Sequence, residues 1–492
     1  MLSFFHRLIR RVLLLLVVLF AVAFIWRGWD MRRGLPLEPW HTAELAEPGA
    51  DEIDRADWAQ YLRVEDALFS RVERDIATAI RPDDRTHFNR YSSTSPVYPW
   101  RFATNWNRSS VLLPEGQPVG AVVLLHGLTD APYSLRHVGK FYRDRGFAVV
   151  SIRLPGHGTV PGSLKVTRLE QWQAAARLAV REARRLAPGD APLHVVGYSN
   201  GGALALDYAI AAVSGEGLAR PDRLVLLSPM VGITPAARFT WLAGLPALVP
   251  GFGQSAWLSV LPEFNPFKYN SMPVNAGQQS FDMTQKVQGG LRRLAEEGRL
   301  DRLPPILTFQ SVFDFTVSAS ATLTEVYGRL PANGSELVLF DANLNVNNRF
   351  GAQVNDDARD AVLAQLPAAP RSFRTVLVTN RNDRSSDVVA RVVEAGAGEG
   401  ADIETGLVYP SDVYSLSHVA VPFPLTDGLY GLTPDPADDF GIRTGIVNTL
   451  GEVDTFVLTL DPILRMTSRM QSNPFFPLMM ERIGAAIAAP KG

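Results

Sequence analysis

Residues 193–202, LHVVGYSNGG, constrain the fold of this chain more than any other stretch. An apolar, β-type run ends in Gly-x-Ser-x-Gly, with Ser199 between Gly197 and Gly201, and an Ala/Leu-rich helical pattern follows. A sharp strand-to-helix turn of this kind holds a serine in a strained backbone conformation, and the glycines leave room for the neighbouring chain. The helix then points backbone N–H groups and a positive dipole end at a developing oxyanion. The motif predicts that Ser199 is a nucleophile.

A second turn lies upstream, where the apolar run at residues 122–125 ends in His126-Gly127. In a strand–turn–helix site of this type, a backbone N–H just after the glycine supplies one oxyanion donor, and the residue after the nucleophile supplies the other. We therefore expect Leu128 and Asn200 to be the two donors. Each such donor contributes about 3 kcal/mol to the transition state.

A serine hydroxyl needs a base to take its proton and a carboxylate to orient that base. The expected chain order is serine, acid, histidine. The chain has eight histidines, and His418 alone lies after Ser199. The base is therefore predicted to be His418, in a polar loop that enters an apolar run.

The acid is less constrained, because several carboxylates lie between the serine and the histidine. Asp314 ends the apolar run at residues 306–313, which places it at the carboxyl end of a predicted strand, where open α/β sheets collect functional groups. Asp341 follows a similar run and is the rival, whereas Asp282 lies in a Pro/aromatic stretch and is disfavoured. The sequence favours Asp314 and keeps Asp341 as the alternative.

The rest of the chain predicts an α/β, doubly wound fold, with a mostly parallel sheet covered on both faces by helices. Continuous apolar runs alternate with helical patterns, for example at residues 169–186 and 202–213. The expected strands are residues 121–125, 147–152, 194–196, 223–227, 306–309 and 336–340. Residues 34–117 are predicted to form a linker and a helical extension, and residues 118–492 the main domain.

Two long stretches interrupt the alternation of strands and helices. Residues 233–285 are rich in Pro, Gly and aromatic residues and predict a cap that forms an apolar lid or simply packs on itself. Residues 342–410 form the second insertion, with an expected strand at 375–378 and an expected helix at 387–393. The aromatic residues of the first stretch are Phe239, Trp241, Phe252, Trp257, Phe264 and Phe267.

Four motifs carry a resemblance to a known family: HGLT at 126–129, RLPGHG at 153–158, GYSNGG at 197–202 and DFTV at 314–317. Over residues 118–425 the chain resembles the monoacylglycerol-lipase, carboxylesterase and serine-aminopeptidase-like branch of the α/β hydrolases. The resemblance implies an eight-stranded sheet with a cap after the sixth strand. It also implies an acid at Asp314 and a structural role for His157. The chain departs from the family at Asp130, where a glycine is common, and in the length of the second insertion.

The N-terminus carries an uncharged apolar run at residues 12–26, with arginines on both sides. A bilayer-spanning helix needs about 20 apolar residues and a signal-peptide core about 7–15, so this run lies at the border. We expect residues 1–33 to form an uncleaved signal anchor, with a cleaved signal peptide as the alternative. This predicts a bacterial inner-membrane protein with its catalytic domain outside the cytoplasm, or a secreted or periplasmic one after cleavage.

These patterns predict a serine hydrolase that cleaves lipid-like or medium-chain acyl esters without a metal or an organic cofactor. A formal net charge of -2 gives no field that would suggest a nucleic-acid partner. The absence of cysteine from the sequence excludes disulfides, thiolate metal sites and a cysteine nucleophile. An acyltransferase, an amidase or aminopeptidase, and a non-catalytic membrane-anchored scaffold on the same fold remain alternatives.

Overall fold

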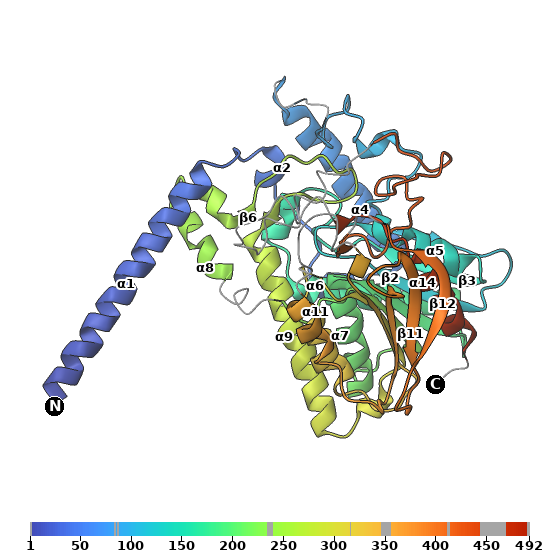
Figure 1. Cartoon of the computed structure of the whole chain (residues 1–492). Helices are drawn as coiled ribbons and strands as arrows, with labels where there is room; N and C mark the ends of the chain where they lie inside the picture. Colours follow the sequence, from blue (N-terminus) through green and yellow to red (C-terminus); the bar gives the residue numbers. More distant parts are fainter. Residues whose placement is uncertain are drawn as a thin grey trace.

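The computed structural model describes residues 2–82, 85, 88–233, 240–314, 316–345, 356–410, 414–442 and 469–489. A large twisted sheet forms its centre (Figure 1). From one edge to the other, its ten strands are β1 (Ser110–Leu112), β3 (Phe147–Ile152), β2 (Gly120–Leu125), β4 (Leu193–Tyr198), β5 (Arg223–Leu227), β8 (Ile306–Ser311), β9 (Glu336–Phe340), β10 (Arg374–Asn380), β11 (Asp387–Val393) and β12 (Ala401–Val408). The strands from β3 to β10 run parallel, whereas β1, β11 and β12 run antiparallel to their neighbours. The predicted mostly parallel sheet is confirmed.

Helices cover both faces of this sheet, because alternate residues of each parallel strand point to opposite faces. On one face, α6 (Leu169–Leu186) and α7 (Asn200–Ser214) pack over β2, and α9 (Val274–Glu296) packs on α7. On the other face, α5 (Arg136–Arg143) packs over β2 and α14 (Phe476–Ala488) over β8. Apolar residues on both faces explain the continuous apolar runs in the sequence.

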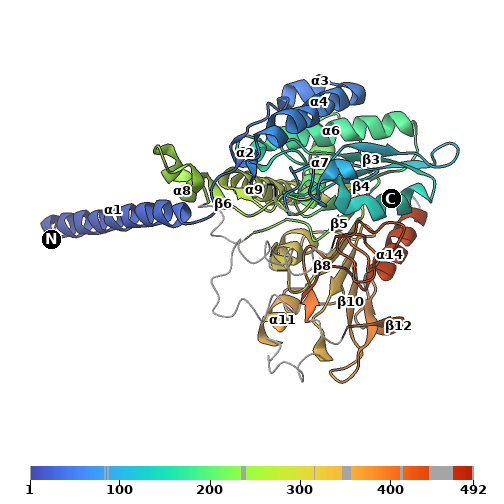
Figure 2. The same ribbon diagram turned by 90° about the horizontal axis from the view of Figure 1, so that it is seen from above.

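An N-terminal extension lies on the outside of α6. It contains α2 (Pro39–Thr42), α3 (Ala50–Arg55) and α4 (Trp58–Arg71), and α3 packs directly against α6. The start of α4 is fixed by a reciprocal cap, in which Asp57 Oδ1 accepts from Gln60 N at 2.7 Å and Gln60 Oε1 accepts from Asp57 N at 2.8 Å. Figure 2 shows α3 and α4 at the end of the molecule opposite α11 (Asp356–Leu363), β10 and β12.

The first helix, α1 (Leu2–Arg32), extends as an arm from the body of the molecule (Figure 1). Its C-terminal end meets the cap, where Arg27 Nη2 donates to Trp257 O at 2.6 Å. In the part of the chain that is described, no helix combines the length and the apolar character that crossing a membrane requires. The membrane-spanning anchor predicted for residues 1–33 is therefore not supported. Residues 12–26 give about 22 Å of uncharged helix, short of a hydrocarbon core of about 30 Å.

The second insertion adds strands to the edge of the sheet. The family resemblance implied eight strands, but β10, β11 and β12 extend the sheet beyond β9, so that it has ten in the described residues. The strand expected at 375–378 is confirmed as part of β10, whereas the helix expected at 387–393 is wrong, because these residues form β11. Its sequence, DVVARVV, is rich in β-branched valine, which favours a pleated surface over a helix.

The first insertion follows β5, the fifth strand along the described chain, where a sixth was expected. Residues 234–239, which include Phe239, and residue Phe315 of the DFTV motif lie outside the described residues. The described part contains α8 (Thr240–Gly244), two short 3₁₀ turns (Leu245–Leu248 and Gly253–Ala256), β6 (Trp257–Ser259) and β7 (Met272–Pro273). The chain then enters α9, which packs on α7.

Candidate active site

Ser199 occupies the turn between β4 and α7. Its backbone has φ 54° and ψ −117°, a conformation that side-chain-bearing residues rarely adopt. The turn is fixed by Ser199 N, which donates to Leu227 O of β5 at 3.0 Å. A Cβ at Gly197 would collide with the backbone of Gly201, and a Cβ at Gly201 would collide with the carbonyl of Leu125. Both positions therefore require glycine for the strand and the helix to approach this closely.

His418 and Asp314 meet across the top of the sheet. Asp314 follows β8, and His418 follows the short strand β13 (Ser415–Leu416), which pairs with β14 (Arg469–Met470). His418 Nδ1 and Asp314 Oδ2 are 2.8 Å apart, and both side chains are almost completely buried. Because a carboxylate oxygen accepts, Nδ1 carries the proton and Nε2 is left as the basic nitrogen.

The Asp314 carboxylate is held by three further donors. Its Oδ1 accepts from the backbone N–H groups of Thr316 at 3.0 Å and Val317 at 2.9 Å. Its Oδ2 also accepts from Gln310 Nε2 at 3.0 Å. These contacts fix the carboxylate in the orientation that it needs to hold the imidazole ring.

The rival acids have other partners. Asp341, at the end of β9, accepts from Arg359 Nε at 2.7 Å and Nη2 at 2.6 Å, and from Thr379 Oγ1 at 2.8 Å. Asp282 is exposed on α9 and accepts from Gln278 Nε2 at 2.8 Å. Of the three candidates that the sequence offered, Asp314 is the one hydrogen-bonded to His418.

Tyr198, the residue before Ser199, connects the serine turn to the loop that carries His418. Its ring stacks on the His418 imidazole with 5.2 Å between the ring centroids, and its hydroxyl donates to His418 O at 3.4 Å. This residue was part of the predicted turn, but the sequence assigned it no function. The sequence carries no signal for the contact, because the two residues are 220 positions apart.

The turn expected to supply the second oxyanion donor lies against the serine. A Cβ at Gly127 would stand 3.3 Å from Ser199 Cβ, so the turn and the nucleophile are in contact. Neither the Leu128 amide nor the Asn200 amide finds a hydrogen-bond acceptor among the described residues. Thr129, which follows Leu128, has φ 59°, and its carbonyl accepts from Tyr269 N of the cap at 2.7 Å.

Asp130, the departure from the family pattern, is buried beside this turn. Its Oδ1 accepts from Ala131 N at 2.8 Å. Burial raises the pKa of Asp130 to about 6, and the nearby charges of Lys268 and His418 act in the opposite direction. A carboxyl group close to the candidate base is therefore a feature of this site.

Two buried histidines, His126 and His157, pack at the turn of residues 126–130. His126 Nε2 accepts from Leu154 N at 3.0 Å, so its Nδ1 carries the proton and donates to Gly127 O at 2.9 Å. The His157 ring packs edge-on against His126, with 5.0 Å between the ring centroids. Burial lowers the pKa of both rings, and that of His157 falls to about 4. Both rings are therefore neutral near pH 7.

The two ends of the second insertion, residues 342–410, lie side by side. This explains how His418 comes close to Asp314 although about a hundred residues separate them. Asn343 N donates to Tyr414 O at 2.8 Å, and Asn343 Nδ2 donates to Pro410 O at 2.9 Å. Tyr409 also donates through its hydroxyl to Asp341 O at 2.9 Å. The chain therefore leaves the site after β9 and returns beside the point where it left.

The described aromatic residues of the cap are largely buried rather than exposed to a substrate. Trp257, Phe264 and Phe267 lie inside the protein, and Phe267 stacks on Tyr133 with 4.6 Å between the ring centroids. Among the large aliphatic side chains of the described cap, Leu248 and Val249 are exposed, at 81% and 42% of their surface. For these three side chains the structure favours packing of the cap over an aromatic lid.

Residues 116–343 match the family model described as serine aminopeptidase, S33. A 61-residue stretch is 39% identical to the thermostable monoacylglycerol lipase of Bacillus sp. (strain H-257), and it covers 12% of this chain and 24% of that relative.

Two solved structures are also similar in part. One, from a study of the metagenome-derived lipolytic enzymes LipS and LipT, is 21% identical and has a TM-score of 0.38; the match covers 48% of this chain and 87% of the other. The other is a soluble variant of monoglyceride lipase from Saccharomyces cerevisiae. It is 14% identical and has a TM-score of 0.36, and the match covers 53% of this chain and 92% of the other.

The family match extends from just before β2 to just after β9. It includes the strained serine turn, the turn at residues 126–130 and Asp314, within a mainly parallel sheet covered on both faces. Residues 116–343 therefore show the α/β-hydrolase fold.

Proposed function

We propose that this protein is a serine hydrolase that cleaves carboxylic esters with lipid-like or medium-chain acyl groups, through Ser199, His418 and Asp314. The observation that carries the proposal is the 2.8 Å contact between His418 and Asp314, beside a serine held at positive φ. A buried carboxylate that fixes the tautomer of a histidine is the arrangement by which a serine hydroxyl becomes a nucleophile.

In the proposed reaction, His418 Nε2 takes the proton of Ser199 Oγ as the oxygen attacks the ester carbonyl. The Leu128 and Asn200 backbone amides donate to the oxyanion. Neither amide has an acceptor in the described chain, which supports this assignment. The alcohol leaves with the proton from His418, and an acyl group remains on Ser199. Water, deprotonated by His418, then releases the acid and restores the serine.

The preference for apolar acyl groups has weaker support than the triad. The relative from Bacillus is named a monoacylglycerol lipase, and the cap of this chain exposes Leu248 and part of Val249. An exposed pair of aliphatic side chains on the cap suits a hydrophobic substrate.

Labelling with a fluorophosphonate probe tests the nucleophile. The parent is expected to react, and Ser199→Ala is expected to lose the label completely. Ser228→Ala is the matched control, because Ser228 is a buried serine at the end of the neighbouring strand, also at positive φ. Equal labelling of Ser199→Ala would show that another residue reacts, and a parent that never labels would support the non-catalytic scaffold.

A series of p-nitrophenyl esters tests the substrate. The value of kcat/KM is expected to rise from acetate to medium-chain esters. Activity confined to acetate would contradict the acyl-chain preference, and faster cleavage of aminoacyl p-nitroanilides would favour an aminopeptidase. Accumulation of a new ester when an alcohol is added would favour an acyltransferase.

A further inference from the structure

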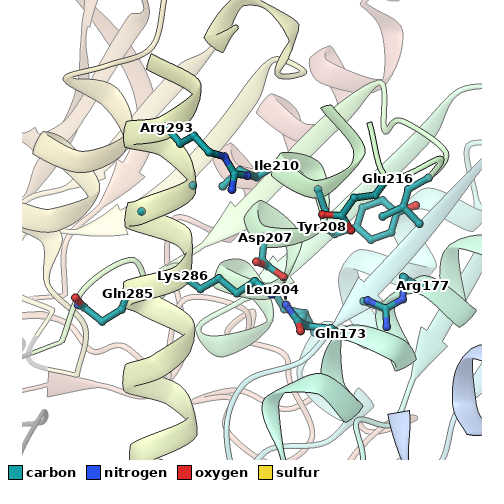
Figure 3. A pocket seen from close by; sticks show the side chains of 15 residues that line it. Gln173, Arg177, Leu204, Asp207, Tyr208, Ile210, Glu216, Gln285, Lys286 and Arg293 are labelled. Atoms are coloured by element: carbon teal, nitrogen blue, oxygen red, sulfur yellow. Dashed lines mark hydrogen bonds between the residues drawn. The ribbon is translucent and has the colours of Figure 1, made fainter. Parts of the chain in front are cut away.

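A cavity of about 280 Å³ lies between α6, α7 and α9, apart from the residues of the proposed triad. It opens along the side of α7, the helix that begins directly after Ser199. Leu204, Ile210 and Leu218 supply apolar walls, while charged side chains from all three helices also line it (Figure 3). A cavity that mixes apolar walls with a few charged groups is typical of sites for small molecules.

Asp207 of α7 and Glu216, which follows this helix, are the two acidic residues that line the cavity, and Asp207 is the buried one. Its Oδ2 accepts from Gln173 Nε2 at 2.5 Å. No donor in the described part of the chain reaches its other oxygen, Oδ1. Burial raises the pKa of Asp207, and the charge of Lys286 acts in the opposite direction. This carboxylate therefore has an acceptor oxygen that a bound molecule can use.

Lys286 and Arg293 of α9 and Arg177 of α6 contribute positive charges to the lining of the cavity. Figure 3 shows Lys286 reaching across the cavity toward the side of Asp207 and Gln173. Among the described residues no carboxylate lies within 4 Å of the Lys286 ammonium group. Arg293 has weak contacts, with Glu297 at 3.9 Å and with Ser214 Oγ at 3.2 Å. The opposite charges of Asp207 and Lys286 thus share a space without forming an ion pair.

We propose that this cavity binds an α-amino acid with an apolar side chain. Its ammonium group donates to Asp207 Oδ1, its carboxylate accepts from Lys286 and Arg293, and its side chain lies against the apolar walls. An anion alone leaves the acceptor of Asp207 unused, and a cation alone faces the positive charge of Lys286. A zwitterion satisfies both groups with charge-assisted hydrogen bonds.

Calorimetric titration of the full-length protein with L-leucine tests this site. Two analogues of the same shape each lack one charge: isoamylamine has no carboxylate, and 4-methylpentanoate has no ammonium group. L-leucine is expected to bind saturably, and each analogue at least about tenfold more weakly, the loss that one charge-assisted hydrogen bond accounts for. Binding of isoamylamine or 4-methylpentanoate as tight as that of L-leucine would overturn the proposal.

Two substitutions test the location of the site. Asp207→Asn keeps the shape but removes the charge, and Gly289→Phe fills the cavity from α9, where a side chain would enter open space. Both are expected to weaken leucine binding at least about tenfold. Asp282→Asn, on the same helix but outside the cavity, is expected to bind leucine as the parent does.

Hydrolysis of p-nitrophenyl esters by each variant reports whether the fold is intact and keeps this proposal separate from that of the active site. A parent that hydrolyses esters but binds no L-leucine would refute the amino-acid site and leave the proposed triad standing. Undiminished leucine binding by both Asp207→Asn and Gly289→Phe would place the amino acid elsewhere on the protein.

Discussion

At the scale of single residues, Asp314 and Asp341 end neighbouring strands but hold different partners. We expect Asp314→Asn to lower kcat for ester hydrolysis by about 10⁴-fold, because an amide no longer holds His418 in the required tautomer. We expect Asp341→Asn to keep kcat within tenfold but to lower the free energy of unfolding by about 3 kcal/mol, because Arg359 loses a buried partner. Steady-state kinetics and urea unfolding of both variants measure the two effects. The reverse pattern would make Asp341 the acid.

His157 gives the fold a dependence on pH. Its pKa is about 4 in the folded protein because the ring is buried, against about 6.5 in an unfolded chain. The unfolded state therefore binds more protons below pH 6.5, and stability falls as the pH drops from 6.5 to 4. The share of His157 in this loss is about 3 kcal/mol.

Urea unfolding of the parent and of His157→Gln at pH 6.5 and at pH 4 measures the contribution of His157 to this loss of stability. The variant is expected to lose about 3 kcal/mol less than the parent over the same interval. His41 and His194 also have pKa values lowered by burial, to about 3, and they contribute equally to both proteins. Identical pH profiles for parent and variant would show that His157 is not buried in its neutral form.

The residues of the site differ in how far the sequence alone predicts them. Ser199 of the proposed triad is predicted by a local motif. His418 is predicted by the expected order of serine, acid and histidine, because no other histidine lies downstream. The sequence favours Asp314 over Asp341 through its place at the end of a predicted strand and the family resemblance of its DFTV motif, yet the contact that distinguishes the two spans 104 residues. The stacking of Tyr198 on His418 depends on the folded path of the chain, which no local pattern encodes.

At the scale of elements, two adjacent glycines in α9 have opposite surroundings. A Cβ at Gly289 meets nothing within 4 Å, whereas a Cβ at Gly290 would stand 2.9 Å from Ile210 Cγ2 of α7. Gly289→Ala is expected to stabilise the protein by about 0.5–1 kcal/mol, because alanine loses less backbone entropy in a helix. Gly290→Ala is expected to destabilise it by about 1 kcal/mol, because α7 and α9 must separate.

Thermal unfolding of the two alanine variants measures this difference directly. They share the same composition change and the same helix, so a difference in melting temperature reports the contact with α7 alone. Equal stabilisation by both substitutions would mean that α9 does not pack on Ile210 as closely as the structure has it.

The errors in the predicted elements arise where one apolar pattern fits two structures. The residues DVVARVV in β11 place valines at spacings that suit a short helix as well as a strand. They form a strand because β10 offers an edge, and the pairing from Thr375–Val393 to Asn380–Val388 satisfies their backbone groups. The partner strand is a tertiary feature, so the sequence of β11 by itself left the structure open.

At the scale of the whole molecule, the N-terminal extension and the hydrolase domain share a buried cluster of charges. Arg153, in the RLPGHG loop, donates to both oxygens of Glu47 at 2.8 and 3.0 Å and to Glu65 Oε2 at 3.1 Å. Glu47 Oε1 also accepts from Gly156 N at 2.9 Å. The adjacent Leu154 backbone amide donates to His126, so the cluster lies one residue from a contact that holds the proposed oxyanion turn. The extension is therefore an integral part of the hydrolase fold.

This connection predicts unequal effects for two glutamates of the same segment. Glu47→Gln is expected to lower the free energy of unfolding by about 3 kcal/mol, because its carboxylate and Arg153 are both buried and the loss of one leaves the other uncompensated. Glu44→Gln is expected to change it by less than about 0.5 kcal/mol, because Glu44 pairs with Lys165 at the surface. Urea unfolding monitored by tryptophan fluorescence measures both, with ester hydrolysis as the check on the oxyanion turn. If the two variants are equally stable, the extension is not held by its buried charge, and the apolar contact between α3 and α6 must fasten it instead.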